Sequence, residues 1–286
     1  MIYAIASGKG GTGKTTVTAS LAALWDGPVT AVDLDVEEPN LHLFLKPDGL
    51  TSEPAFIEVP EVDEDKCTHC RACSELCQFK AISVMGDLLL TFPEMCHGCG
   101  GCMEICPEGA ITPGQRELGE ILTGKAGKAN FLMGRLRIGE AMSPPLMRQV
   151  MQRMPESMRV NDVLIDAPPG VSCPAVCAVI HADCVILVTE PTPFGLHDFK
   201  LAVEAFAPMG KPMGAVINRA GIGHDEVQRF CREKGIPIWA EIPYDRAVAE
   251  AYSRGEIPGV SVPSLKGTFD SLKQHITEAA KEVRHA

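Results

Sequence analysis

Short apolar runs alternate with longer amphipathic stretches along most of the chain. Apolar runs predict buried strands at 2–6, 29–33, 130–138, 160–166, 183–189, 214–218 and 236–242. Helical patterns lie between them at 17–25, 145–154, 173–180, 196–207 and 225–234. Strands that are apolar throughout and alternate with helices are typical of βαβ units. We therefore predict a doubly wound α/β fold around a mostly parallel sheet.

The segment 61–113 interrupts this alternation. It holds eight of the twelve cysteines, nine acidic residues and three basic ones, for a net charge of −6. So short and cysteine-dense a segment cannot build a hydrophobic core unaided. A turn at 47–49 and a charged passage at 58–66 precede it. We predict one domain formed by 1–60 and 114–286, with 61–113 inserted as a small second domain.

The C-terminal helical pattern has one apolar face. Leu265, Phe269, Leu272, Ile276 and Val283 form this face, while acids and bases mix on the other side. A helix that lies on a membrane surface usually has a strongly cationic polar face. We therefore expect this helix to dock on the sheet, with membrane binding as the alternative.

Composition argues against several classes of function. The 286 residues carry a formal net charge of −11, which disfavours coating of nucleic acid and binding to anionic membranes. No run of about 18 apolar residues could span a membrane, and the chain begins with a strand pattern instead of a signal peptide. We expect a cytoplasmic protein, in which cysteines serve as metal ligands before they form disulfides.

The stretch SGKGGTGKTT, at 7–16, predicts a phosphate-binding loop between a strand and a helix. Its glycines let backbone N–H groups turn inward toward a nucleoside triphosphate. Lys14 is expected to reach the β and γ phosphates, and Thr15 to ligate Mg²⁺. The predicted nucleotide-binding residues of the loop are Gly8, Gly10, Gly11, Thr12, Gly13, Lys14, Thr15 and Thr16.

Eight cysteines of 61–113 occur as two copies of the spacing C-x₂-C-x₂-C-x₃-C, and Pro107 follows the second copy. This is the signature of bacterial ferredoxins with two [4Fe–4S] clusters. In that signature the fourth cysteine of each copy ligates the other cluster, because the short spacer keeps it from closing on its own. We assign cluster I to Cys67, Cys70, Cys73 and Cys106, and cluster II to Cys96, Cys99, Cys102 and Cys77.

Other interpretations of these cysteines stay open. Paired zinc sites use tetrads built from cysteine pairs, and a disulfide framework suits an oxidising compartment. Gln78 stands where the first copy would carry proline, although proline supplies no ligand. His69 and His97 lie beside predicted ligands, and we expect both on the solvated surface.

With both motifs in place, the chain resembles the MinD/ParA family of P-loop ATPases, which includes the nitrogenase iron protein and the Mrp/Nbp-type iron–sulfur carriers. KGGTGKTT, at 9–16, is similar to the phosphate loop of that family, and 61–113 resembles the ferredoxin domain inserted in one MinD-like group. The resemblance implies ATP and Mg²⁺ as cofactors beside the two clusters. It also implies an ATP-dependent homodimer, or a heterodimer with a paralogue.

The resemblance lends roles to polar residues around the loop. Lys9 resembles the signature lysine that reaches the nucleotide of the partner subunit, with a plain surface lysine as the alternative. Asp35 resembles the switch I aspartate that positions the attacking water. Asp166 resembles the Walker B aspartate, and Asp33 is placed near the Mg²⁺ shell. The implied catalytic set is Lys9, Lys14, Asp35 and Asp166.

Two later segments resemble the base side of the family's nucleotide site. Asn218 and Arg219 follow a predicted strand and match the base-recognition position. The stretch IPYD, at 242–245, matches a further family loop near the base.

The last four cysteines lie outside the insert. Cys173 matches a cysteine that the nitrogenase iron protein uses for a cluster shared between subunits, and Cys177 lies one helical turn away. A bridging cluster on these two is one interpretation, and small buried side chains are the other. Cys184 and Cys231 are expected in the core.

Three functions remain in competition. In the first, the nucleotide cycle gates electron transfer through the two clusters to a redox or iron–sulfur partner. In the second, the protein carries iron–sulfur clusters as the Mrp/Nbp group does. The third is a positional switch that resembles MinD, with the clusters as redox sensors.

Overall fold

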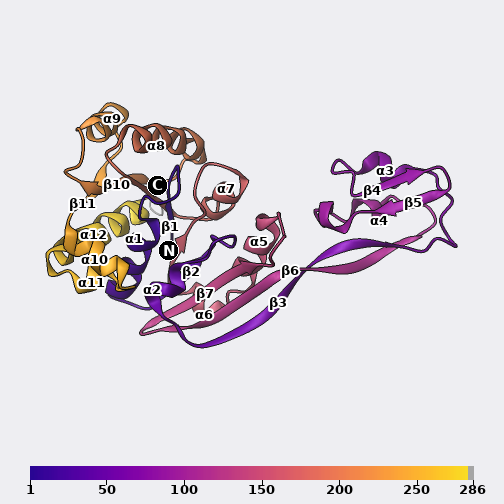
Figure 1. Ribbon diagram of the computed structural model, residues 1–286, viewed down its shortest axis with the longest axis horizontal. Helices are drawn as coiled ribbons and strands as arrows, with labels where there is room; N and C mark the ends of the chain where they lie inside the picture. The colour runs from indigo at the N-terminus through magenta and orange to yellow at the C-terminus, as the bar shows by residue number, and fades with distance from the viewer. Residues whose placement is uncertain (283–286) are drawn as a thin grey trace. The chain divides into compact units, whose positions relative to one another are not determined.

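The computed structural model of the protein describes residues 1–282 and divides into two compact units. The larger unit comprises Met1–Ser52, Ile121–Arg135 and Met147–Ala286, and the smaller one Glu53–Glu120 and Leu136–Leu146. A nine-stranded sheet has the order β11-β10-β9-β1-β8-β2-β7-β6-β3 (Figure 1). Its strands are β1 Ile2–Ala6, β2 Val29–Asp33, β3 Asp48–Val62, β6 Ile111–Ala126, β7 Ala129–Leu136, β8 Asp162–Asp166, β9 Cys184–Thr189, β10 Met213–Ala220 and β11 Ile238–Pro243.

Helices connect most of these strands. The α-helices are α1 Lys14–Leu24, α2 Leu41–Leu45, α3 Ala72–Leu76, α4 Gly101–Glu104, α5 Ser143–Arg153, α6 Glu156–Arg159, α7 Cys173–Val179, α8 Pro193–Phe206, α9 Glu226–Lys234, α10 Arg246–Ser253, α11 Pro258–Ser261 and α12 Lys266–Glu282. Single turns of 3₁₀ helix are η1 Pro93–Met95, η2 Ala207–Met209 and η3 Pro263–Leu265.

The larger unit confirms the predicted α/β fold. Every pairing from β11 across to β7 is parallel. Alternate residues of β1 point to opposite faces of the sheet, and both sets are buried. Tyr3 and Ile5 share a core with α1 and α12, while α7 and α8 contact β1 and β9 (Figure 1). Because helices cover both faces of the sheet, the residues of these strands are apolar throughout.

The C-terminal helix docks on the sheet, as its apolar face predicts. Leu265 just before α12, and Phe269, Leu272 and Ile276 within it, are at most 1% exposed and belong to the core of the larger unit. Val283 lies outside the described residues. Among residues 1–282, no helix combines the length and apolar character that a membrane crossing requires.

The smaller unit has little apolar interior around its two cysteine copies. The antiparallel pair β4 Ile82–Met85 and β5 Leu88–Thr91 packs with α3 and α4. Its buried cluster consists of Cys73, Ile82, Leu89 and Ile111, and four more cysteines pack against it. All eight cysteines of the two copies lie in this unit, and thiols therefore make up much of this small cluster and its surroundings.

Two long strands were not predicted. β3 occupies 48–62, where the sequence suggested a turn at 47–49 and a domain boundary, and β6 occupies 111–126. The first seven residues of β3 are exposed, since β3 is the edge strand of the sheet. These seven residues have no buried face, so no alternation of apolar and polar residues reveals this part of β3.

Candidate functional site

The phosphate loop joins β1 to α1, which begins at Lys14. Two of its glycines are required by close neighbours. A Cβ on Gly8 would lie 1.9 Å from the backbone oxygen of Asp198, and a Cβ on Gly13 would lie 2.3 Å from Nδ2 of Asn218. Gly13 also has a φ of 99°, in the left-handed region that favours glycine. The path of the loop therefore depends on α8 and β10 as well as on its own sequence.

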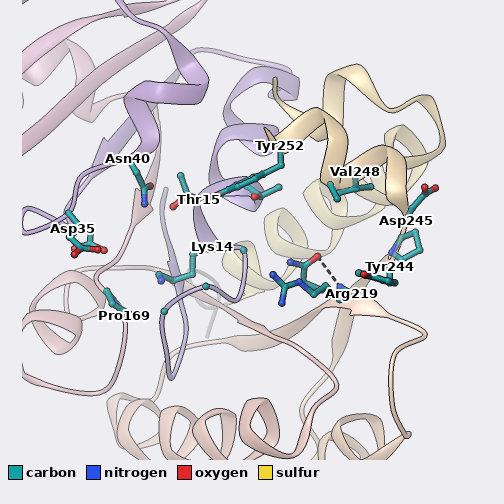
Figure 2. A pocket seen from close by; sticks show the side chains of 18 residues that line it. Lys14, Thr15, Asp35, Asn40, Pro169, Arg219, Tyr244, Asp245, Val248 and Tyr252 are labelled. Atoms are coloured by element: carbon teal, nitrogen blue, oxygen red, sulfur yellow. Dashed lines mark hydrogen bonds between the residues drawn. The ribbon is translucent and has the colours of Figure 1, made fainter. Parts of the chain in front are cut away.

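A cavity of about 380 Å³ lies against this loop. Figure 2 shows Lys14 and Thr15 in the middle of the view, with Asp35 and Pro169 on one side and Arg219 on the other. Gly8 and Thr12 are not part of the wall. The loop residues in the wall are Gly10, Gly11, Gly13, Lys14, Thr15 and Thr16. The volume and the ring of loop amides suit a nucleotide.

The loop is tied to the end of β8. Thr15 Oγ1 donates a hydrogen bond of 2.6 Å to Oδ2 of Asp166. Thr18 Oγ1 lies 3.1 Å from Asp166 Oδ1 and 3.0 Å from the carbonyl of Lys14. Thr18 was not predicted as a site residue. It lies one helical turn after Lys14, on the face of α1 that the sheet covers, so both oxygens of Asp166 are held by α1.

Asp33 ends β2, and it is the register partner of Asp166 in the sheet. Its carboxylate accepts N–H bonds of 3.0 Å from Asp35 and Asn40, and one of 2.9 Å from Leu41. These bonds fold the residues after β2 back over the strand end and start α2. Asp33 thus organises the segment that brings Asp35 and Asn40 into the cavity wall.

Burial raises the pKa of all three aspartates. For Asp35 the pKa rises to about 6, since burial and the charge of Asp166 outweigh the opposing charge of Lys14. For Asp33, the charge of Asp166 adds to the effect of burial. Like charges therefore gather at the carboxyl edge of β2 and β8, and a bound divalent cation would relieve them. Carboxylate and hydroxyl oxygens are the ligands that Mg²⁺ prefers, so these residues fit the predicted site.

Asn218 and Arg219, which were predicted to contact the base, line the same cavity as Asp35 and Pro169. The side-chain amide of Asn218 is already hydrogen-bonded within the chain. Its Nδ2 donates to the carbonyl of Thr12 at 2.8 Å, and its Oδ1 accepts the N–H of Arg219 at 2.9 Å. Asn218 therefore braces the phosphate loop. Residues 243–245 line the wall, as do Val248 and Tyr252 of α10.

Lys9 does not reach the cavity wall. Its ammonium pairs with Glu190, and the other carboxylate oxygen of Glu190 accepts a bond of 2.8 Å from Arg219 Nη1. Sequence reasoning missed Glu190. It follows β9 directly, just as Asp33 and Asp166 end β2 and β8, so its place at a strand end was the available signal.

A family model described as the CobQ/CobB/MinD/ParA nucleotide binding domain matches residues 3–258. The chain belongs to this family. The match spans the phosphate loop, both strand-end aspartates and the base side of the cavity.

Known relatives of this nucleotide-binding chain resemble it over most of its length. An uncharacterized protein of Methanocaldococcus jannaschii is 31% identical over 287 residues, which cover 99% of this chain and 97% of the relative. An uncharacterized ATP-binding protein of the same organism is 26% identical and covers 88% of this chain and 77% of its own. The cell division ATPase MinD of Pyrococcus furiosus is 25% identical, with a TM-score of 0.59 and coverage of 97% and 98%.

In the smaller unit of this MinD/ParA-family chain, the two cysteine copies share one backbone course. Equivalent positions lie 29 residues apart, as Cys67 and Cys96 do. Asp63 N donates to Ala110 O, and its equivalent Phe92 N donates to Ala81 O, each at 2.8 Å. Each copy therefore begins beside the end of the other. Positive φ angles also recur in pairs, at His69 and Gly98, Arg71 and Gly100, and Lys80 and Gly109.

The thiols suit the crossed assignment. A small cavity is lined by four cysteines that were assigned to cluster I: Cys67, Cys70, Cys73 and Cys106. All cysteines among the described residues are free thiols, which gives no support to a disulfide framework. No three His, Cys, Asp or Glu side chains within residues 1–282 gather around the position of one metal ion. The fit to clusters thus rests on the cavity, the free thiols and the exchanged copies.

The four cysteines outside the two copies differ in exposure. Cys184 and Cys231 are buried in the larger unit, as expected. Cys173 is exposed at the start of α7, and Cys177 is half-buried on the same face one turn later. Burial raises the pKa of the Cys177 thiol, and the charge of Arg148 opposes this rise. Among the described residues, no third ligand completes a site beside these two.

Proposed function

We propose that the protein is a Mg²⁺-dependent ATPase that dimerises around ATP. The contact that carries this proposal is the hydrogen bond from Thr15 to Asp166 under the nucleotide cavity. It brings a P-loop hydroxyl and a strand-end carboxylate together, which is the pair that holds Mg²⁺ in P-loop enzymes. Membership in a nucleotide-binding family and similarity to an ATP-binding protein and to MinD support ATP as the nucleotide.

Hydrolysis is an in-line attack of water on the γ-phosphorus. The new P–O bond forms while the bond to the β–γ bridging oxygen breaks, and ADP leaves. Lys14 and the loop amides bind the phosphates, and Asp35 accepts a hydrogen bond from the attacking water. Thr15, Asp33 and Asp166 hold Mg²⁺, which supplies charge neutralisation when bound. Asn218 and Arg219 contact the base side, and Lys9 reaches the ATP of the partner subunit.

The smaller unit is proposed to hold two [4Fe–4S] clusters, a group that supplies one-electron chemistry. Cys67, Cys70, Cys73 and Cys106 hold cluster I, and Cys96, Cys99, Cys102 and Cys77 hold cluster II. The four-cysteine cavity supports the ligand set of cluster I, and the exchanged copies support the crossing of the fourth cysteine in both sets. The domain limits that we propose remain 1–60 with 114–286, and 61–113.

The nucleotide cycle is then proposed to gate electron transfer between this unit and a redox partner. A MinD-like positional switch is the second candidate, because the chain resembles the cell division ATPase MinD along nearly its whole length. A cluster carrier is the third, and it places a labile cluster at Cys173 and Cys177.

Hydrolysis and dimerisation are tested by substitution of the two loop lysines. Lys14→Ala is expected to lower the ATPase rate about 100-fold or more, since it removes positive charge from the γ-phosphate. Lys9→Ala is expected to bind ATP but to stay monomeric in sedimentation. Lys234→Ala, at an exposed position of α9, is the matched control and should behave as the wild type. An ATP-dependent dimer of Lys9→Ala would show that Lys9 has no role across subunits.

The gating proposal is tested by the midpoint potentials of the clusters with and without ATP. A shift with ATP, together with a changed rate of reduction of a small electron acceptor, is expected. If both stay constant, the gate is excluded and the MinD-like switch remains. The carrier alternative fails if the Cys173→Ala/Cys177→Ala variant still donates clusters to an apo-ferredoxin.

A further inference from the structure

Glu190 is a buried carboxylate to which hydrolysis assigns no role. It directly follows β9, at the same edge of the sheet where Asp33 and Asp166 end their strands. The residue is only 7% exposed. A buried carboxylate is costly unless it is paired, so its partners indicate what it does.

Both oxygens of Glu190 are paired with cations from different parts of the site. Oε1 accepts from the ammonium of Lys9 in the phosphate loop, and Oε2 accepts from Arg219 Nη1 at 2.8 Å. Burial alone raises the pKa of Glu190, but the hydrogen bond from Lys9 and the charges of both cations lower it overall. The group therefore stays ionised, and it connects the phosphate loop to the end of β10.

The carboxylate is fixed more firmly than its cations. A Cβ on Gly195 would lie 2.2 Å from the backbone oxygen of Glu190 and 2.8 Å from its Cγ, so α8 packs directly against the residue. The side chain of Lys9 is 29% exposed and that of Arg219 is 50% exposed, against 9% for Glu190. When either ion pair opens, the cation can therefore move while Glu190 stays in place.

We propose that Glu190 is a positioning residue that holds Lys9 within its own subunit and yields it to the triphosphate of a second copy of this chain. This inference rests on the proposed ATP-dependent dimer. Lys9 exchanges a carboxylate for a γ-phosphate, and Glu190 keeps Arg219, so neither buried charge is left unpaired. ADP has no γ-phosphate to offer in exchange. Glu190 thereby makes dimerisation depend on the third phosphate.

The test is a titration of dimer formation by ATP and by ADP, measured by sedimentation velocity for the full chain. Glu190→Gln keeps the shape of the side chain but removes the charge that competes for Lys9. A hydrogen bond to a charged group contributes enough that half-dimerisation is expected at an ATP concentration about 10- to 100-fold lower. ADP should also produce dimers of this variant. Glu204→Gln, at an exposed position of α8, is the control and should match the wild type.

A second variant covers the case in which Glu190→Gln does not fold, which a thermal melt would reveal. Glu190→Asp keeps the charge but is one methylene shorter, so it cannot reach both cations, and an intermediate shift is expected. The double variant Lys9→Ala/Glu190→Gln should lose the gain entirely. Titrations of the folded Glu190 variants that superimpose on the wild type would overturn the inference. A wild-type chain that never dimerises with ATP would instead overturn the proposed function beneath it.

Discussion

Each of the two units of this molecule is stabilised by different interactions in its interior. The larger unit buries both faces of its parallel sheet, and α1 and α12 pack into one continuous core with β1. In the smaller unit, the buried cluster beside the two cysteine copies has four members, one of which is a cysteine. A site in the larger unit can therefore be built before its ligand arrives, whereas the cysteine-bearing segment 61–113 has little apolar burial of its own.

The two units also differ in which ionisable groups have raised pKa values. In the larger unit, buried Asp33 and Asp166 and half-buried Asp35 all have raised pKa values and are tolerated near Lys14, because the surrounding core stabilises the fold. In the smaller unit, burial raises the pKa of the Cys73 and Cys102 thiols. These two thiols stay protonated at pH 7, and a bound cluster would displace their protons and link the segments that the cysteines come from.

The largest expected effect is a loss of iron and of protection from hydrogen exchange that is confined to the smaller unit. The wild type should hold about eight irons per chain, and Cys73→Ser about four, because one cluster loses a ligand. Hydrogen exchange should then speed up in 61–113, while the larger unit and its ATP binding stay intact. The measurements are iron analysis and exchange read out by mass spectrometry.

Cys231→Ala is the matched control for this prediction. It removes a buried thiol from the larger unit, so it should lower the melting temperature and leave the iron content unchanged. Zinc in place of iron in the wild type, or equal iron loss in both variants, would contradict the contrast between the units.

A smaller effect is expected on the melting temperature of the larger unit when the charge of Asp35 is removed. The pKa of Asp35 is raised to about 6, so the folded chain holds its proton more tightly than the unfolded chain does. The stability cost of the charge is therefore absent below about pH 4 and grows as the pH rises to about 6. Asp35→Asn should raise the melting temperature of the nucleotide-free protein by a few degrees at pH 7.5 and hardly at all at pH 4.

The same substitution should nearly abolish ATP hydrolysis, because an amide cannot accept the water proton as a carboxylate does. Gain of stability and loss of activity would thus come from one residue. Asp48→Asn, at an exposed position outside the cavity wall, is the control. An equal rise in melting temperature at both pH values would show that the charge of Asp35 is not the cause.

The smallest effect lies in the backbone of the smaller unit. Arg71 has a φ of 69°, and its equivalent in the second copy is Gly100 with a φ of 72°. Arg71→Gly should stabilise the cluster-loaded unit by about 1 kcal/mol, since glycine adopts this conformation without strain. Gly100→Ala should do the opposite. Denaturant midpoints followed through the cluster absorbance measure both, and no difference would mean that the two copies do not share this constraint.

How far the sequence predicts this protein depends on how local each signal is. The strand–loop–helix at 2–25 and the buried strands that end at Asp33 and Asp166 were predicted nearly to the residue. β3 was missed, because its outer half is exposed on both faces and carries no periodic apolar signal. The hydrogen bond from Asn218 to Thr12 was also not predicted, since the two residues are 206 positions apart in the chain.

By itself, the sequence determined the parallel sheet, the phosphate loop around Lys14 and the paired cysteine spacing, because each depends on residues close together in the chain. Only the tertiary structure decided that Asp166 is held by Thr15 and Thr18, and that Lys9 is paired with Glu190. Those contacts join residues on separate strands and loops. Which strand ends meet is determined by the packing of the whole sheet, and spacing along the chain carries no record of it.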